Sequence, residues 1–227
     1  MKIVFWGETK RCGTTSNMLA VAGMLSVLRP DVRVEVRTLG LAQRSMRPYA
    51  GEEKSFRKDS DDTERVSCNE NQNMHFCFFD CGSGKDKRRR DILRQADLVV
   101  VNLVQDEAAL QEFFMYDIHI APNILILMGK YYELSGYGRG YLERFYRIGP
   151  ETIGVIPCNA AFEKAADKGK VRQFVQMESQ MSNNKRNQEL LQELTHFVEL
   201  LLQNAGELQC KKEKQHCRIK TKQRDEG

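Results

Sequence analysis

The first thirty residues of this chain constrain its fold more than any other stretch. Residues 1–6 form a short apolar run, and residues 7–16 form a polar loop that contains glycines and hydroxyl side chains. Residues 17–29 carry apolar side chains at three- and four-residue spacings, which is typical of a helix packed on one face. Strand, tight loop and helix in this order are the layout of a phosphate-binding loop, in which backbone N–H groups and the positive end of the helix dipole face an anion.

The loop departs from the standard motif Gly-x-x-x-x-Gly-Lys-Ser/Thr. Gly13 lies one position further from Gly7 than the motif requires, and Thr14 stands where the lysine belongs. The sequence therefore predicts the backbone of a phosphate loop without its main cation.

Strand and helix patterns alternate through the rest of the chain. We expect helices at 87–95, 107–116, 141–147, 163–176 and 184–203, and further strands at 32–39, 75–79, 98–103, 123–128 and 152–156. Repeated strand–helix pairs predict an α/β fold: a doubly wound, mostly parallel sheet with helices on both faces, like that of P-loop NTPases.

Two stretches differ from this pattern. Residues 43–73 are polar and charged, which favours a long surface loop or a small mobile insert. Residues 205–227 are basic and poor in apolar side chains, and we expect a disordered tail. The predicted domain therefore spans residues 1–204.

Length and composition restrict the class of protein. The chain has 227 residues, enough for one α/β domain with a substantial core. No apolar run approaches the roughly 18 residues that a membrane span needs, and the N-terminus enters a strand directly, so we expect neither a transmembrane segment nor a signal peptide. Seven scattered cysteines indicate reduced thiols and a cytoplasmic protein rather than a disulfide framework.

Asp80 is the second candidate for chemistry. It directly follows a buried strand, and doubly wound folds bind ligands at the carboxyl ends of their strands. Beside a phosphate loop, this carboxylate would hold Mg²⁺ together with the hydroxyl of Thr15 or Ser16. The alternative is an aspartate that caps the following turn, in which Gly82 and Gly84 supply unusual backbone angles.

Two other groups have simpler interpretations. Cys77 and Cys81 flank Asp80 without a second metal-binding pair, so Cys77 is best read as a small core residue. The basic stretch at 85–90 either contacts a phosphate or an acidic partner, or forms a solvated helix face.

Four segments in sequence resemble the MinD/ParA class of deviant-Walker P-loop ATPases, and most closely its atypical TadZ/CpaE pilus-assembly branch. The segments are Lys10-Arg-Cys-Gly-Thr-Thr-Ser16, Asp80-Cys-Gly-Ser-Gly84, Ala96-Asp-Leu-Val-Val-Val-Asn102 and Ile153-Gly-Val-Ile-Pro-Cys-Asn159. The resemblance covers residues 1–204 and implies a cytoplasmic, ATP-binding homodimer that uses Mg²⁺.

The resemblance also assigns site residues. It implies that the loop contacts the phosphates through Lys10, Arg11, Cys12, Gly13, Thr14, Thr15 and Ser16. Lys10 or Arg11 would supply the missing positive charge. Thr15 and Asp80 would hold Mg²⁺, and Gly84 would sense the γ-phosphate. Relatives present an asparagine to adenine where this chain has Met128-Gly-Lys130, which shifts base recognition to Cys158 and Asn159.

The missing lysine weakens the case for fast hydrolysis, and residues 38–44 also lack the acid that orients water in active relatives. We therefore expect at most a slow ATPase that acts as a localisation or assembly switch. Its partners would belong to a pilus or secretion apparatus, and would recruit it to the membrane or cell pole. The alternatives are a pseudo-ATPase scaffold that binds no nucleotide, and a partition protein that binds DNA through basic patches.

Overall fold

The computed structural model describes residues 1–39, 63–64 and 75–225. Apart from residues 63–64, the insert expected at 43–73 lies outside the described residues. The prediction for that segment is therefore not addressed by the fold.

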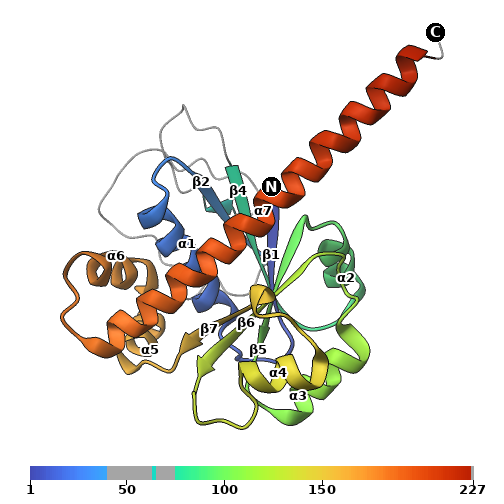
Figure 1. The fold of residues 1–227 in the computed structure, drawn as a ribbon. Coiled ribbons are helices and arrows are strands. Elements are labelled where there is room, and N and C mark those ends of the chain that lie inside the picture. Colours follow the sequence, from blue (N-terminus) through green and yellow to red (C-terminus); the bar gives the residue numbers. More distant parts are fainter. Residues whose placement is uncertain (40–62, 65–74, 226–227) are drawn as a thin grey trace.

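A seven-stranded sheet runs through the middle of the molecule in the order β3-β2-β4-β1-β5-β6-β7 (Figure 1). All neighbours pair in parallel except β3, which is antiparallel to β2. The strands are β1 (Lys2–Gly7), β2 (Arg33–Thr38), β3 (Thr63–Glu64), β4 (His75–Ser83), β5 (Leu98–Leu103), β6 (Ile124–Tyr131) and β7 (Ile153–Pro157). The predicted doubly wound α/β fold is confirmed.

Helices cover both faces of this sheet. One face carries α1 (Thr14–Leu28), α5 (Ala160–Asp167), α6 (Val171–Met181) and α7 (Lys185–Asp225). The other carries α2 (Lys87–Arg94), α3 (Glu107–Glu112), the π-helical segment η2 (Phe113–Asp117) and α4 (Arg139–Tyr146), and the 3₁₀ turn η3 (Pro150–Thr152) leads into β7. Because β1 lies centrally between β4 and β5, the loops that follow these three strands meet at one edge of the sheet.

The core follows from alternation along the strands. Ile3 and Phe5 of β1 pack with α1 and α7, whereas Val4 and Trp6 pack with the helices of the opposite face. All four side chains are fully buried. Since successive side chains of a strand point to opposite faces, one six-residue strand contributes to both hydrophobic clusters.

Three features differ from the expectations. β4 continues to Ser83, so Asp80 lies inside the strand rather than after it. The helix expected at 163–176 is two helices, separated at Gly169, which has a φ of 66°. The last helix does not stop near residue 203 but continues through the expected tail to Asp225.

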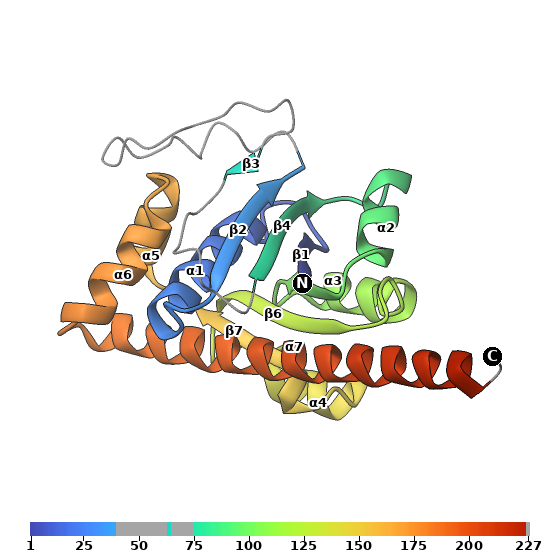
Figure 2. The ribbon, with the colours of Figure 1, turned by 90° about the horizontal axis from the view of Figure 1, so that it is seen from above.

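The composition of this last segment explains its helical structure. Residues 185–225 contain no proline and only one glycine, and they are rich in Lys, Glu, Gln and Leu, which are strong helix formers. Figure 2 shows α7 running along the body and projecting beyond it. Its apolar side chains Leu190, Leu194, Phe197, Val198 and Leu201 are buried against the sheet and α1, as the amphipathic pattern predicted.

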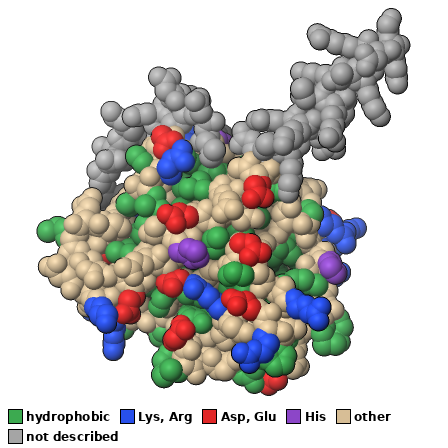
Figure 3. Space-filling model, viewed as in Figure 1, with side chains coloured by type: hydrophobic (Ala, Val, Ile, Leu, Met, Phe, Trp, Pro, Cys, Tyr) green, Lys and Arg blue, Asp and Glu red, His purple; other side chains and the backbone are tan. Residues whose placement is uncertain are grey.

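The face crossed by α7 carries acidic and basic side chains interspersed with one another (Figure 3). Within the described part of the chain, none of the helices combines the length and the apolar character that crossing a bilayer would require.

Candidate functional site

The loop between β1 and α1 turns sharply into its helix. Gly13, the residue before α1, has a φ of 85°, a left-handed conformation that glycine adopts without steric cost. α1 begins at Thr14, three residues earlier than its apolar pattern indicated, so Thr15 and Ser16 belong to its first turn. No side chain caps this helix and no acid lies in its first turn, which leaves its N-terminal N–H groups suited to an anion.

Buried polar contacts hold the loop against the sheet. Asn17 donates from Nδ2 to Oδ1 of Asn102 at 2.9 Å, and Asn102 on β5 is fully buried. A Cβ added at Gly129 on β6 would lie 2.7 Å from Asn17 Nδ2 and 3.0 Å from the carbonyl oxygen of Cys12. The close approach of loop and strand therefore requires glycine at that position.

The residue in place of the motif lysine faces inward. Thr14 is 7% exposed, and its Oγ1 lies 3.1 Å from Sγ of Cys12. Burial raises the pKa of the Cys12 thiol, partly offset by its hydrogen bond with Thr14. Thr14 therefore completes the interior of the loop and provides no charge to a ligand.

Thr15 and Asp80 are in direct contact. Oγ1 of Thr15 donates to Oδ2 of Asp80 at 2.5 Å, and the Gly82 N–H donates to the other carboxylate oxygen at 2.8 Å. Asp80 is 3% exposed. Burial raises the pKa of this carboxyl above its ordinary value of 3.8, and the two hydrogen bonds oppose the shift. The alternative role as a turn cap is realised as well, since the Gly82 bond is of that kind.

A cavity of about 480 Å³ opens beside the loop. Of the residues singled out in the sequence, it is lined by Arg11, Cys12, Gly13, Thr14, Thr15, Ser16, Cys158 and Asn159. Lys10 is exposed and does not line it, and neither does Gly84, whose carbonyl oxygen accepts a hydrogen bond from Trp6 Nε1 at 3.0 Å. Gly82 and Ser83 line the cavity where Gly84 had been expected.

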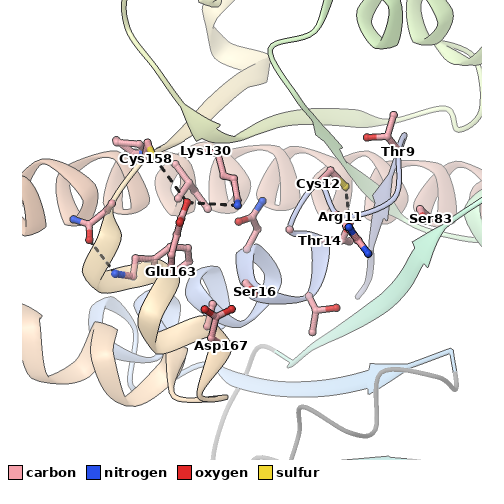
Figure 4. Close-up of a pocket in the computed structure, with 18 of the residues that line it drawn as sticks. Thr9, Arg11, Cys12, Thr14, Ser16, Ser83, Lys130, Cys158, Glu163 and Asp167 are labelled. Atoms are coloured by element: carbon pink, nitrogen blue, oxygen red, sulfur yellow. Dashed lines mark hydrogen bonds and ion pairs between the residues drawn. The ribbon is translucent and has the colours of Figure 1, made fainter.

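The end of the cavity away from the loop includes Lys130 of β6, Cys158 after β7 and Glu163 of α5 (Figure 4). Lys130 Nζ lies 3.5 Å from Glu163 Oε1, and Cys158 Sγ lies 3.9 Å from the same oxygen. We call these three residues the distal end and the loop the phosphate end. Asp80 does not line the cavity and lies behind Thr15, which it contacts. Neither Lys130 nor Glu163 was expected as a site residue, because Lys130 lies in the stretch that lacks the asparagine of relatives and no local signal marks Glu163 as a ligand contact.

Asn159 lines the cavity, but its side-chain amide is already engaged. Oδ1 accepts from the Phe162 N–H at 2.9 Å, which caps α5, and Nδ2 donates to Arg186 O and Asn187 Oδ1 at 3.2 and 2.9 Å. The residue is 4% exposed. Its amide therefore joins α5 to the start of α7, and reading a base would break those bonds.

A second ionic group lies at the same edge of the sheet. Lys85, two residues after β4, places its Nζ 2.8 Å from Glu8, 2.6 Å from Glu112 and 2.7 Å from Asp117. We call these four residues the Lys85 cluster. Partial burial lowers the pKa of Lys85, but the hydrogen bonds to the three carboxylates outweigh it and raise that pKa above its usual value. Burial raises the pKa of Glu8, and Lys85 opposes the shift.

The Lys85 cluster resolves part of the expectation for residues 85–90. Lys85 is neither a phosphate ligand nor part of a solvated face, because its partners are carboxylates of the same chain. Its neighbour Asp86 caps α2 by accepting from the Arg89 N–H at 3.2 Å.

Comparisons with known proteins support the fold. No family model and no curated protein matches the sequence. Among solved structures, a ParA family ATPase from Chlorobium tepidum TLS is similar with a TM-score of 0.58 and 12% identity, over 87% of this chain and 96% of that one. A proposed plasmid partition protein from Borrelia burgdorferi B31, bound to AMPPNP, is similar with a TM-score of 0.54 and 11% identity, over 89% of this chain and 98% of that one.

These identities are too low to transfer function, but the lengths and the arrangement of elements agree. The expected MinD/ParA class is supported at the level of fold, and nothing distinguishes the TadZ/CpaE branch. The chain has the P-loop NTPase-like α/β fold of ParA-family ATPases.

Proposed function

We propose that this protein binds a nucleoside triphosphate with Mg²⁺ and acts as a nucleotide-dependent switch. The observation that carries the proposal is the contact between Thr15 and Asp80 at the start of α1, where the helix N-terminus borders the cavity. A hydroxyl in the first turn and a buried carboxylate on a neighbouring strand are hard oxygen ligands, the kind that Mg²⁺ takes in such sites.

The residues fit the phosphates and the metal in distinct ways. The uncapped N–H groups of α1 would take phosphate oxygens, and Arg11, which lines the cavity, would add positive charge. Thr15 and Asp80 would hold Mg²⁺, which supplies the charge that neutralises phosphate oxygens. ATP is the ligand that the resemblance implies, and one structural neighbour is bound to AMPPNP.

Slow or absent hydrolysis follows from the same geometry. Thr14 occupies the lysine position and is buried against Cys12, so no ammonium group enters the cavity from there. Removing one group that stabilises transition-state charge costs on the order of 10²–10³ in rate. The protein would then act mainly through the difference between its nucleotide-bound and nucleotide-free states, and not through turnover of the nucleotide.

The biological setting is proposed from the resemblance. A homodimer that recruits protein partners of a pilus or secretion apparatus, and through them reaches the membrane or cell pole, is the reading that the TadZ/CpaE-like motifs favour. A DNA-partition role is the second candidate, because the two solved structures compared above are a ParA family ATPase and a proposed plasmid partition protein. It predicts DNA affinity that falls steeply with salt.

Thermal melting of the full chain with Mg²⁺ and each of ATP, GTP and ADP tests the proposal. A ligand at about one hundred times its dissociation constant stabilises the fold by about 2.7 kcal/mol, enough to move the midpoint visibly. A midpoint that no nucleotide shifts at millimolar concentration would refute the switch and leave the scaffold reading.

A further inference from the structure

The phosphate end and the distal end of the cavity fix how a nucleotide would lie. Phosphates belong at the N-terminus of α1, near Gly13 and Ser16. In Figure 4, Lys130, Cys158 and Glu163 lie on one side and Thr9, Arg11 and Thr14 on the other. Given the proposed function, on which this step rests, the base faces the distal end.

The distal end offers two charged groups to that base. The Glu163 carboxylate accepts hydrogen bonds at two oxygens, and the Lys130 ammonium only donates. Their side chains are 42% and 63% exposed, so the pair at 3.5 Å is accessible to a ligand. Such an exposed ion pair contributes little to stability, and the fold does not depend on it.

The backbone places Lys130 in an unusual way. Its φ is 50°, in the left-handed region that non-glycine residues rarely adopt. The pairing of β6 with β7 shifts register between Met128 and Tyr131, around this residue. Strand irregularities of this kind redirect side chains next to binding sites, and the side chain redirected here lines the cavity.

Guanine and adenine differ in the groups they present to such a pair. Guanine carries the acceptors O6 and N7 and the donor N2–H₂, and its N1–H is a second donor beside it; adenine carries the donor N6–H₂ and acceptors at N1 and N7. A carboxylate can accept from N1–H and N2–H₂ of guanine together, while an ammonium donates to O6. Against adenine, one carboxylate oxygen would face the N1 lone pair.

We propose that Glu163 and Lys130 select guanine over adenine, so that the preferred ligand is a guanine nucleotide with Mg²⁺. Asn159 takes no part, because its amide is committed to the α5 cap and to α7. One bidentate contact of this type discriminates between bases by about tenfold or more.

The test is titration calorimetry of the full chain with Mg²⁺ and non-hydrolysable GTP and ATP analogues, together with ITP and XTP. We expect the GTP analogue to bind about tenfold or more tightly than the ATP analogue. ITP lacks the 2-amino group and should bind less tightly than GTP. The wild-type chain should reject XTP, whose carbonyl oxygen at position 2 faces the carboxylate.

Glu163→Gln provides the decisive variant. Its amide can donate to the 2-carbonyl of xanthine, so the variant should lose most of its preference for GTP and gain affinity for XTP. Lys130→Met should weaken GTP more than ATP. The matched control is Glu143→Gln on α4, an exposed residue outside the cavity, which should leave all four affinities unchanged.

The outcomes separate the two proposals. Tighter binding of ATP, or a GTP-to-ATP ratio that Glu163→Gln leaves unchanged, overturns guanine selection while nucleotide binding stands. Binding of none of the nucleotides overturns both.

Discussion

The phosphate end of the cavity and the Lys85 cluster lie at the same edge of the sheet but use charge in opposite ways. In the Lys85 cluster, one ammonium group contacts three carboxylates of the protein, those of Glu8, Glu112 and Asp117. At the phosphate end, the start of α1 presents uncapped N–H groups, and β4 places beside it the buried Asp80, whose pKa is raised. The contrast indicates that the first group stabilises the edge of the sheet, whereas the second is left for a ligand.

Removing the central cation should give the largest effect on stability. Lys85→Met leaves three carboxylates together, and the Glu8 side chain is only 2% exposed. Breaking a buried pair by removing one partner costs about 3–5 kcal/mol, and the one-third exposure of Lys85 reduces this to about 2–3 kcal/mol. Urea denaturation measures the loss.

Two further variants test whether the loss of stability in Lys85→Met comes from the Lys85 cluster. Lys87→Met, at an exposed position on α2, should change stability by no more than about 0.5 kcal/mol. The double variant Lys85→Met with Glu8→Gln should recover part of the loss. A single variant as stable as the wild type would mean that the cluster contributes nothing.

Beside the phosphate end, Asp80→Asn should separate ligand binding from folding. The raised pKa means that the ionised carboxylate destabilises the unliganded fold, so the variant should be as stable as the wild type or more so. It should nevertheless lose most of the stabilisation by nucleotide with Mg²⁺, about 2.7 kcal/mol at one hundred times the dissociation constant. Melting curves with and without ligand report both quantities.

Thr15→Val is the companion to this variant. It keeps the shape of the side chain and removes the hydroxyl that contacts Asp80. A nucleotide response that survives both changes would place the metal elsewhere.

Asn159→Ala should reduce stability without affecting the choice of base. Loss of a helix cap lowers the free energy of unfolding by about 0.5–2 kcal/mol. Because the variant also loses the bonds to Arg186 and Asn187, we expect a loss near the upper end of this range. The ratio of GTP to ATP affinity should remain that of the wild type. A changed ratio with intact stability would restore Asn159 as a base-reading residue.

The smallest effect concerns thiol reactivity. Cys158 is exposed and lines the cavity, whereas Cys81 is fully buried, which raises its pKa to about 11. At pH 8 only about one Cys81 thiol in a thousand is ionised, so alkylation followed by peptide mass spectrometry should modify Cys158 first. Bound nucleotide should slow the reaction at Cys158, and an unchanged rate would indicate that the ligand does not reach the distal end.

The fold was largely predictable because its signals are local. Alternating apolar residues and the chain order of Thr15 and Asp80 were enough to expect a sheet with these two side chains at one edge, where they are 2.5 Å apart. The boundaries were less accurate. Helix propensity carries α7 beyond its buried stripe, and strand pairing with β1 extends β4 past Asp80.

The distal end and the Lys85 cluster depend on contacts between distant residues. Lys130 and Glu163 meet only because β6 and α5 are folded together, and Lys85 contacts Glu8 although the two residues lie far apart in the sequence. The resemblance implied that Asn159 reads the base, because it matches a segment that lies near the base in relatives. An asparagine after a strand can equally cap the following helix. Only the hydrogen-bond partners distinguish the two roles.

The anchoring of α7 has a mechanical consequence. This helix of 41 residues is roughly 60 Å long, and Asn159, at the border of the cavity, bonds to its first turn through Arg186 and Asn187. Buried side chains hold this helix against the body as far as Ala205, so the lever arm is the roughly 30 Å that project beyond that residue. A tilt of about 5° moves the end of this arm by about 3 Å, so a small adjustment around the cavity is amplified at the far end of the helix.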